Sequence, residues 1–397
     1  MKHRFACLLT SVAMMAAATI GIIGLGAAPA QASTGLVMAA ATTQGAGEGL
    51  YYDWQTAGAS TWNEELVASG LWGTPSMTIQ SNGNVLISDV DYSNYTLYFF
   101  WQGYQTTTWH QEQVSATGAA AFAATSIAVQ VVPSSGQAAY VAIVAENNAD
   151  TNGNPAFTYY YSQIGKAGWY SQSLPGGYDG QSVPEVTVGP DNEIMVIFAP
   201  GVQTSAATGF YIDFQLYGST TWNELYVATG HIEFQPQIEV QPTGNIIVAD
   251  SIGTRADLQG VDFYWSPADD IDTWHTESLS PTGGLNEPGV TMADDPVAGT
   301  ITITGGFGGN CIPTLTQAYG PNPWVVGQIN TGCPGLSSGV PSIADQANGG
   351  LIAATSGPDG GQGYFYWAAE GSTAWHVETL PGLVAVFGGI AIASYTP

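Results

Sequence analysis

The chain alternates short apolar and polar segments in a pattern that recurs about every 50 residues. Each repeat closes with two short runs, the first rich in aromatic residues and the second opening with tryptophan, separated by turn-forming residues. Such a pair of runs predicts a β-hairpin. The tryptophans that open the second run are Trp62, Trp109, Trp169, Trp222, Trp274, Trp324 and Trp375.

Two more strands are predicted before each hairpin. The clearest pairs are PEVTV (184–188) with EIMVIF (193–198), and PQIEV (236–240) with NIIVAD (245–250), each joined by a compact turn. Four antiparallel strands in about 50 residues match one blade of a β-propeller. The pattern therefore predicts an all-β fold, a seven-bladed β-propeller with four-stranded antiparallel blades.

The first hairpin lacks an innermost strand, and the C-terminal tail supplies a candidate. Its segment GGIAIAS (388–394) resembles the first strands of the other repeats. We expect it to pair with the N-terminal strands LVMAAAT (36–42), LYYDW (50–54) and TWNEELV (61–67). Such a joint closes the ring and covers sheet edges that are otherwise open.

The N-terminus predicts a signal peptide over residues 1–32. A basic start (Lys2, His3 and Arg4) precedes an apolar run, and Ala30-Gln31-Ala32 has the small residues of a cleavage site. The domain organisation expected is a signal peptide, 1–32, and a single propeller domain, 33–397, that is secreted. An uncleaved membrane anchor is the alternative. No later segment is long and apolar enough to insert into a membrane.

Charge narrows the range of partners. Two of the four basic residues lie in the signal, and all 31 acidic residues lie beyond it, which changes the formal charge from −27 to −29. A surface this anionic repels phosphate backbones and anionic headgroups, so nucleic-acid and membrane-surface roles are disfavoured. Cys311 and Cys333 are the two cysteines left outside the signal, and a disulfide between them is the expectation for an oxidising compartment.

Candidate chemistry in the repeats is sparse. His110, His275 and His376 follow their tryptophans, each with Glu two residues later, but copies in separate blades cannot converge on one metal or acid–base centre. We interpret these pairs as polar residues of exposed strands. Asp150, Asn152 and Asn154 alternate as in a Ca²⁺ loop without the rest of an EF-hand. We therefore predict no cofactor and no metal site, with Ca²⁺ as the alternative.

Catalysis has limited support in the sequence. Asp89, Glu146 and Asp250 fall near the ends of second strands, where carboxylates of a glycosidase could converge. Nothing in their spacing distinguishes them from solvated loop residues. Sialidase chemistry is disfavoured, because the chain lacks the S-x-D-x-G-x-x-W pattern and has too few arginines for a carboxylate clamp. No catalytic residue is predicted.

The aligned hairpins, Y-x-W…G-S-T-x-W-H-x-E-x-[VL], resemble those of the seven-bladed propeller lectins of the bacterial PLL type over about residues 36–397. They are more distantly similar to fungal fucose-binding and tectonin-like propellers. This resemblance implies glycan binding in pockets between blades by aromatic stacking. Fucose specificity does not carry over, because the arginines that fungal pockets use are missing. The expected carbohydrate-binding residues are Trp72, Trp54, Trp101, Trp265 and Trp367.

The sequence and the resemblance together predict a secreted, non-catalytic lectin-like propeller that binds glycans or a cell-surface polysaccharide at several weak sites. Two alternatives stay open. One is a protein-interaction scaffold or cell-envelope component that uses a face of the propeller. The other is an extracellular glycosidase or lyase, which needs carboxylates that converge on the centre of the ring.

Overall fold

The structure is a computed structural model. It describes residues 35–395 except for 44–47, 57–58, 72, 119, 133–137, 148–155, 165, 178–182, 200–207, 231–234, 255–256, 269, 280–284, 308–311, 330–340, 357–360, 373 and 382–385. Several predictions lie outside the described residues, namely the signal peptide 1–32, Trp72, the Cys311–Cys333 disulfide and the loop that carries Asp150, Asn152 and Asn154.

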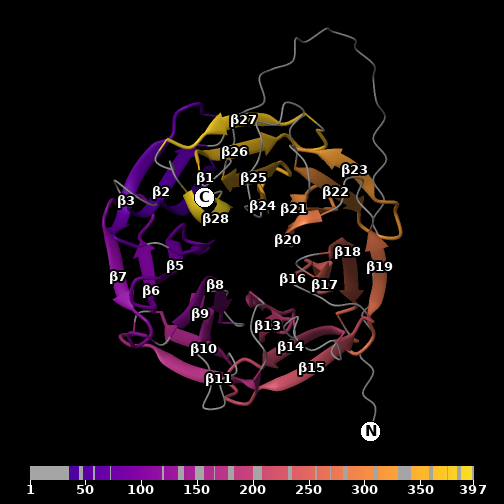
Figure 1. The fold of residues 1–397 in the computed structure, drawn as a ribbon, viewed down its shortest axis with the longest axis horizontal. Helices are drawn as coiled ribbons and strands as arrows, with labels where there is room; N and C mark the ends of the chain where they lie inside the picture. Colours follow the sequence, from indigo (N-terminus) through magenta and orange to yellow (C-terminus); the bar gives the residue numbers. More distant parts are fainter. Residues whose placement is uncertain are drawn as a thin grey trace, which may run out of the picture. The chain divides into compact units, whose positions relative to one another are not determined.

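The described residues are all-β and form seven four-stranded antiparallel sheets. These sheets are arranged as the blades of a ring, with the first strand of each blade nearest its centre (Figure 1). The prediction of a seven-bladed β-propeller is confirmed. No helix in this part of the chain is long and apolar enough to cross a membrane.

The blades are numbered in chain order, and the strands of each follow one another from the centre of the ring outwards. Blades 1 to 4 consist of β28 (Val386–Tyr395), β1 (Leu36–Thr43), β2 (Gly49–Thr56) and β3 (Asn63–Ser69); β4 (Ser76–Ile79), β5 (Val85–Asp91), β6 (Thr96–Gln102) and β7 (Trp109–Gln113); β8 (Ala120–Val131), β9 (Ala138–Asn147), β10 (Ala156–Gln163) and β11 (Tyr170–Gly177); β12 (Glu185–Val188), β13 (Ile194–Phe198), β14 (Gly209–Gln215) and β15 (Asn223–Ala228).

Blades 5 to 7 follow the same order. They consist of β16 (Gln237–Val240), β17 (Ile246–Thr254), β18 (Asp257–Ser266) and β19 (His275–Leu279); β20 (Leu285–Asp295), β21 (Thr300–Phe307), β22 (Pro313–Ala318) and β23 (Val325–Gln328); β24 (Ser342–Asp345), β25 (Leu351–Ser356), β26 (Gly363–Ala368) and β27 (His376–Thr379).

Burial explains the sequence pattern along each blade. Second strands such as β5 and β13 are buried at every position, because blades cover them on both faces. Third strands such as β6 keep one partly open position in three, and fourth strands such as β7 are largely exposed. The near-continuous apolar runs of the sequence are therefore second and third strands, and the polar runs that follow tryptophan are outer strands.

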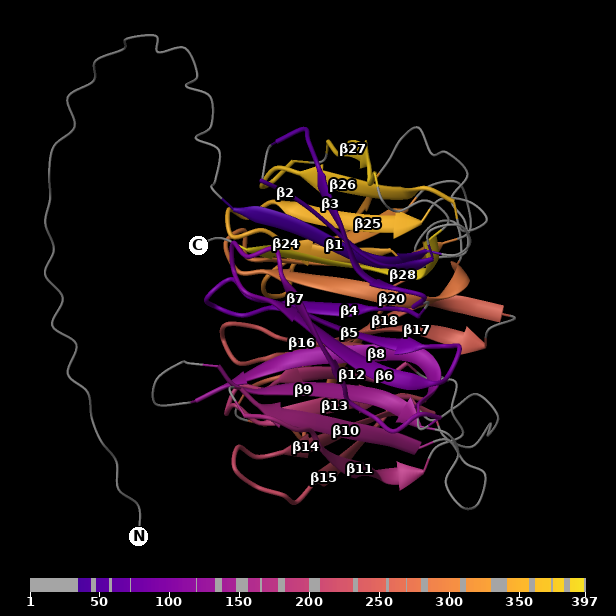
Figure 2. The same ribbon diagram turned by 90° about the vertical axis from the view of Figure 1, so that its left-hand side faces the viewer.

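Ring closure follows the predicted joint. The C-terminal strand β28 pairs with β1, with Val37 opposite Ser394 and Ala39 opposite Ile392, so the two strands lie side by side (Figure 2). The joint extends into the next blade. Tyr395 packs edge-to-face on Tyr104 of blade 2, with ring centroids 5.4 Å apart. The C-terminal strand therefore connects three consecutive blades, 7, 1 and 2.

The hairpin tryptophans pack between blades. Six of the seven contact an aromatic ring on the third strand of the preceding blade, edge-to-face, as for Trp62 on Phe365 with ring centroids 4.9 Å apart. The same contact recurs in five further pairs, Trp109–Tyr52, Trp169–Phe99, Trp222–Tyr159, Trp274–Phe210 and Trp324–Phe263. The repeated tryptophan is thus a packing residue of the ring.

Candidate functional site

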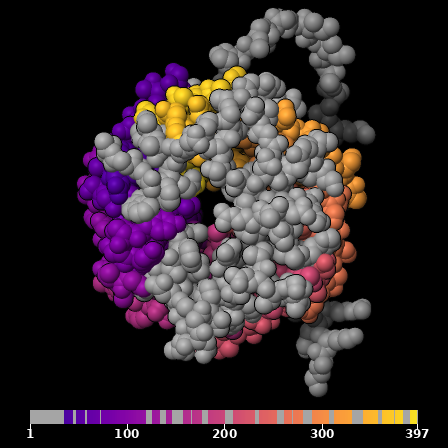
Figure 3. All heavy atoms as spheres, in the orientation of Figure 1, coloured from indigo at the N-terminus to yellow at the C-terminus, as the bar shows by residue number. Residues whose placement is uncertain are grey.

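The first strands of the blades surround the centre of the ring, and Figure 3 shows a hollow there on the face in view. Their side chains are mostly half-buried, as in β4, where all four positions are partly open. Blades 2 and 3 present small side chains at this wall, among them Ser76, Thr78 and Ser126. Blades 4 to 7 instead carry four carboxyl groups, which we name the inner carboxyl cluster: Glu185, Glu239, Asp294 and Asp345.

The four groups lie at different depths. In each blade the first strand ends at the face that carries the turn to the second strand and the turn between strands three and four, which we name the turn face. Glu185 is the first residue of β12, far from that face, whereas Asp345 is the last residue of β24 and lies near it. Glu239 is the third of the four residues of β16. The cluster therefore spans the length of the inner wall.

Glu185 bridges blades 4 and 5. Its Oε2 accepts a hydrogen bond of 2.6 Å from the backbone N–H of Ile238. Serine hydroxyls take the same position in blades 2 and 3, where Ser126 accepts from Val186 N–H at 3.0 Å. The carboxyl thus replaces a neutral acceptor in a ring of inter-blade bonds. Burial raises the pKa of Glu185 to about 8, although the hydrogen bond from Ile238 acts in the opposite direction.

Glu239 is the most strongly perturbed member of the cluster. Burial raises its pKa well above the usual range, and the negative charges of Glu185, Asp294 and Asp345 raise it further. The backbone N–H of Asp294 donates to this carboxyl and only partly offsets the effect. The surroundings of Glu239 therefore favour its protonated form.

The two aspartates are held differently. Asp294 Oδ1 accepts hydrogen bonds from the Tyr319 hydroxyl at 2.7 Å and from the Gln241 amide at 3.2 Å, which fix its orientation. Burial raises the pKa of Asp345 to about 6, and the charges of Asp295 and Asp294 contribute to the rise. The surroundings of Glu239 and Asp345 thus raise the two pKa values to different extents, as a proton donor and a proton acceptor of one reaction require.

No basic side chain offsets this charge in the part of the chain that the structure describes. Lys166 is the only lysine or arginine there, and it is exposed on the hairpin of blade 3. Among the described residues no three His, Cys, Asp or Glu side chains are grouped so as to hold a metal ion. The described lining of the inner wall is therefore acidic or neutral.

The predicted carbohydrate-binding residues do not converge. Trp54, Trp101, Trp265 and Trp367 lie on the third strands of four different blades. Each stacks within its own blade: Trp101 on His110 at 3.9 Å, Trp367 on His376 at 4.0 Å, Trp265 on His275 at 5.1 Å, and Trp54 on Tyr52 at 5.2 Å between ring centroids. Of the four, Trp54 lines a cavity.

The His–Glu pairs of the outer strands have a structural role. In each pair the histidine stacks on the aromatic ring of the third strand, and in two of the three pairs the glutamate accepts a hydrogen bond from the tryptophan of the next blade. Glu112 accepts from the Trp169 indole at 2.9 Å, and Glu378 accepts from the Trp62 indole at 2.8 Å. The interpretation as exposed polar pairs is incomplete, since these glutamates connect blades.

Two carboxylates near second-strand ends are fully buried rather than open to the ring. Asp89 accepts from the backbone N–H of Val90, and Asp250 accepts from that of Gln235, both at 2.9 Å. The side chain of Glu146 lies outside the described residues. Asp270 Oδ2 accepts from the Thr273 hydroxyl within its turn.

Sequence reasoning missed the inner carboxyl cluster, although its residues stood in the strands that it identified. Glu185 and Glu239 occur in PEVTV and PQIEV, where the alternation places a polar residue on a half-buried strand. The available signal was the comparison of first strands. Most carry Ser, Thr or Ala at the positions of Glu185 and Glu239, and Asp294 and Asp345 stand one residue later, where blades 2, 4 and 5 have Ile or Val.

No family model and no curated protein matches the sequence. Solved structures match its fold. An α-L-arabinanase from Penicillium chrysogenum, complexed with arabinobiose, is 14% identical with a TM-score of 0.55, over 79% of this chain and 94% of the other. The α-L-arabinofuranosidase Arb93A from Fusarium graminearum is 11% identical with a TM-score of 0.51, over 72% and 88%. A prolyl endopeptidase is 9% identical with a TM-score of 0.52, over 84% of this chain and 46% of that one.

These matches correct two predictions. The prediction of a non-catalytic lectin and the prediction that the chain is not an enzyme are contradicted by two of the matches, the arabinanase and the arabinofuranosidase, which cover most of both chains. The error has a physical reason. Lectin binding was inferred from framework aromatic residues, which hold blades together in any propeller. At identities of 14% or less, the likeness itself establishes the shared fold.

Proposed function

We propose that the chain is a glycoside-active enzyme that hydrolyses a neutral polysaccharide or oligosaccharide at the inner wall of the propeller. The observation that carries the proposal is the inner carboxyl cluster itself, in which burial raises the pKa of Glu239 well above its usual range and that of Asp345 to about 6. Hydrolysis of a glycosidic bond by two carboxyl groups needs one protonated acid and one ionised base or nucleophile. The arabinanase and arabinofuranosidase that share the fold support the same reaction class.

Each carboxyl has a defined part in this reaction. Glu239 donates its proton to the glycosidic oxygen, and the bond from that oxygen to the anomeric carbon breaks with its electron pair on the oxygen. Asp345 takes a proton from a water whose oxygen bonds to the anomeric carbon. Asp294, held by Tyr319 and Gln241, supplies negative charge beside the positively charged transition state.

The substrate is proposed to be neutral and extracellular. With Lys166 the only described basic side chain and the cluster acidic, sialic or uronic acids would meet repulsion rather than a clamp. The basic start and the small-residue cleavage pattern within residues 1–32 support export of the domain, so that it meets glycans outside the cell.

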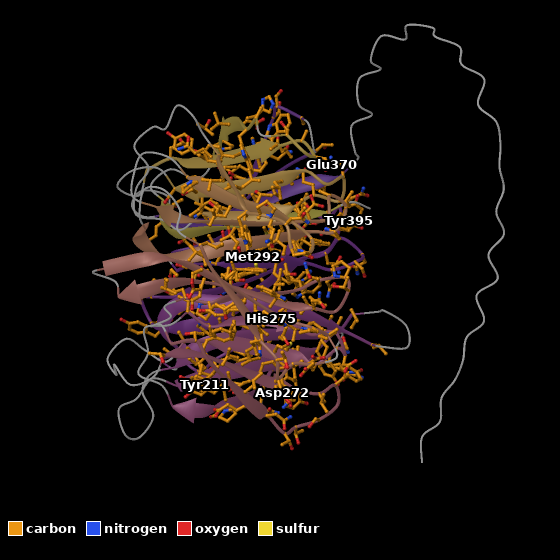
Figure 4. The ribbon with its side chains drawn as sticks, turned by 90° about the vertical axis from the view of Figure 1, so that its right-hand side faces the viewer. Tyr211, Asp272, His275, Met292, Glu370 and Tyr395 are labelled. Carbon is orange, nitrogen blue, oxygen red and sulfur yellow. The ribbon has the colours of Figure 1, made fainter. Side chains whose placement is uncertain are left out.

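A substrate panel tests the proposal. The purified secreted protein is incubated with arabinan, arabinoxylan, xylan and galactan from pH 4 to 8, and released reducing ends are measured. We expect release from at least one, with a loss of about 100-fold or more in both Glu239→Gln and Asp345→Asn. Glu370→Gln is the matched control, because Glu370 is an exposed hairpin carboxyl that lies on the turn face with Tyr395 (Figure 4). Absence of release from every glycan, or full activity in Glu239→Gln, would overturn it.

A further inference from the structure

A cavity of about 260 Å³ lies on the turn face between blades 1 and 2. Its wall is largely apolar and includes Leu36, Met38, Trp54 and Tyr104. Its rim is formed by residues 102–107 of the hairpin of blade 2, which offer amide and hydroxyl groups. None of the described residues that line it is acidic or basic. The cavity is thus built for an uncharged, mainly apolar group with some hydrogen-bonding capacity.

The repeat contains an equivalent position between blades 3 and 4. Met38 pairs with Trp54 in blade 1, and Ala142 pairs with Tyr161 in blade 3. Two residues before each of these second-strand positions stand Leu36 and Tyr140, which are therefore equivalent. The hairpins align as well: Tyr104 and Tyr217 each stand five residues before their tryptophans, Trp109 and Trp222.

The chain fills the second position with its own phenol ring. Tyr140 lies edge-to-face with Tyr161 at 6.3 Å and 67°, and with Tyr217 at 6.4 Å and 65°. It therefore sits between the equivalents of Trp54 and Tyr104. This geometry is the favoured one for a ring between two aromatic side chains.

Smaller residues stand at three equivalent positions around the cavity between blades 1 and 2; of the larger ones, Tyr140 occupies the corresponding space, whereas Leu216 is 53% exposed. Leu36 replaces Tyr140, Gly103 replaces Leu216, and Gly83 replaces Asn192. Gly83 has φ +84°, and a Cβ there would stand 2.7 Å from the Tyr104 ring. Glycine at this turn therefore lets Tyr104 lie against the cavity.

We propose that this cavity binds a small neutral phenol, whose ring takes the place that Tyr140 takes between blades 3 and 4. The ring packs between Trp54 and Tyr104, and its hydroxyl meets the amide and hydroxyl groups of residues 102–107. The volume is sufficient, since an apolar cavity of about 150 Å³ accommodates benzene. The site is separate from the inner carboxyl cluster and independent of the proposed hydrolysis.

Titration of the full secreted protein with p-cresol tests the site, by calorimetry and ligand-observed NMR. We expect one site with a dissociation constant on the order of 0.1–1 mM. Leu36→Tyr copies Tyr140 and fills the cavity, and should weaken binding by about 10-fold or more. Gly103→Leu adds a side chain at a lining position of the hairpin and is the second filling variant. Tyr140→Leu opens the equivalent position and should raise the stoichiometry from one to two.

Competition experiments with a sugar and with a tyrosine derivative define the class of ligand. Methyl arabinofuranoside should neither bind at this site nor displace p-cresol, and binding that displaces it would overturn the proposal. A second competitor, N-acetyltyrosinamide, distinguishes two sources of the phenol. If it competes with p-cresol, the site accepts a phenol carried on a polypeptide; if it does not bind, the site accepts a free phenol. Both outcomes support a phenol site. Absence of p-cresol binding, or equal binding in folded Leu36→Tyr and Gly103→Leu, overturns it.

Discussion

Glu378→Ala tests whether the glutamate of the W-H-x-E pattern holds blades together. Glu378 Oε2 of blade 7 accepts the Trp62 indole N–H at 2.8 Å and the Gln55 amide at 3.2 Å, both from blade 1. This boundary lies between the first and last blades of the ring. Alanine removes the acceptor and leaves both donors without it, and Gln55 is only 2% exposed.

The expected loss follows from these two bonds. A hydrogen bond to a charged group contributes about 1.5–3 kcal/mol, and a buried donor left unpaired costs a similar amount. Glu378 is half-buried, so water recovers part of the loss. We expect a decrease of about 2–4 kcal/mol in the free energy of unfolding. In a domain of this size, 1 kcal/mol corresponds to roughly 1–2 °C, so the melting temperature should fall by about 3–6 °C.

The chain offers a matched control for this change. Glu277 occupies the equivalent position of blade 5, but it is exposed, and the Trp324 indole N–H has no acceptor among the described residues. Glu277→Ala should therefore change the free energy of unfolding by less than about 0.5 kcal/mol. Both variants are compared with the parent by calorimetry and urea unfolding. Equal melting temperatures for Glu378→Ala and Glu277→Ala would refute the inter-blade role of the glutamate.

Three further predictions follow from burial and backbone geometry. Burial raises the pKa of Glu185 from 4.5 to about 8, so between these values the unfolded chain loses a proton that the folded chain keeps, and stability falls as pH rises. Glu185→Gln should remove up to about 3 kcal/mol of that fall, measured as urea midpoints from pH 4.5 to 8; an unchanged slope contradicts it. Gly83→Ala should cost about 1–3 kcal/mol more than Gly118→Ala, because both have positive φ but only Gly83 lies against a ring, Tyr104; equal melting temperatures count against this. Phe100→Ala, fully buried between blades 1 and 2, should cost about 3–5 kcal/mol in urea unfolding, and a cost below 1 kcal/mol would exclude the packing described.

The fold could be predicted from the sequence because its signals are local and repeated. Each blade repeats the same hairpin, and strand pairing within a blade joins neighbours in the chain. Even the one non-local pairing, β28 with β1, left a trace, since GGIAIAS has no hairpin of its own to join. The sequence defined strand ends less well. Most outer strands begin one residue after the tryptophan, as β27 does at His376 after Trp375. That tryptophan packs against the neighbouring blade instead.

The candidate site could not be predicted, since it depends on how different blades meet. Asp294 and Asp345 are 51 positions apart and belong to separate repeats, yet both contribute to the raised pKa of Glu239. Sequence spacing does not reveal that the first strands of different blades surround the same centre of the ring. The aromatic residues attracted the functional interpretation because they recur, and recurrence in this chain marks packing.

Departures from the repeat are therefore the better guide to function in this chain. A residue present in every blade, such as the hairpin tryptophan, satisfies a requirement that every blade shares. A reaction centre needs different groups at one place, and a symmetric ring acquires them only where blades differ. Glu239 stands where blades 2 and 4 have Thr78 and Thr187, and its carboxyl then meets Asp294 with no cation nearby among the described residues. Leu36 is likewise smaller than its equivalent Tyr140, and it lines the phenol-sized cavity. A substitution that restores the repeat, Glu239→Thr, should hence remove activity while leaving the ring folded.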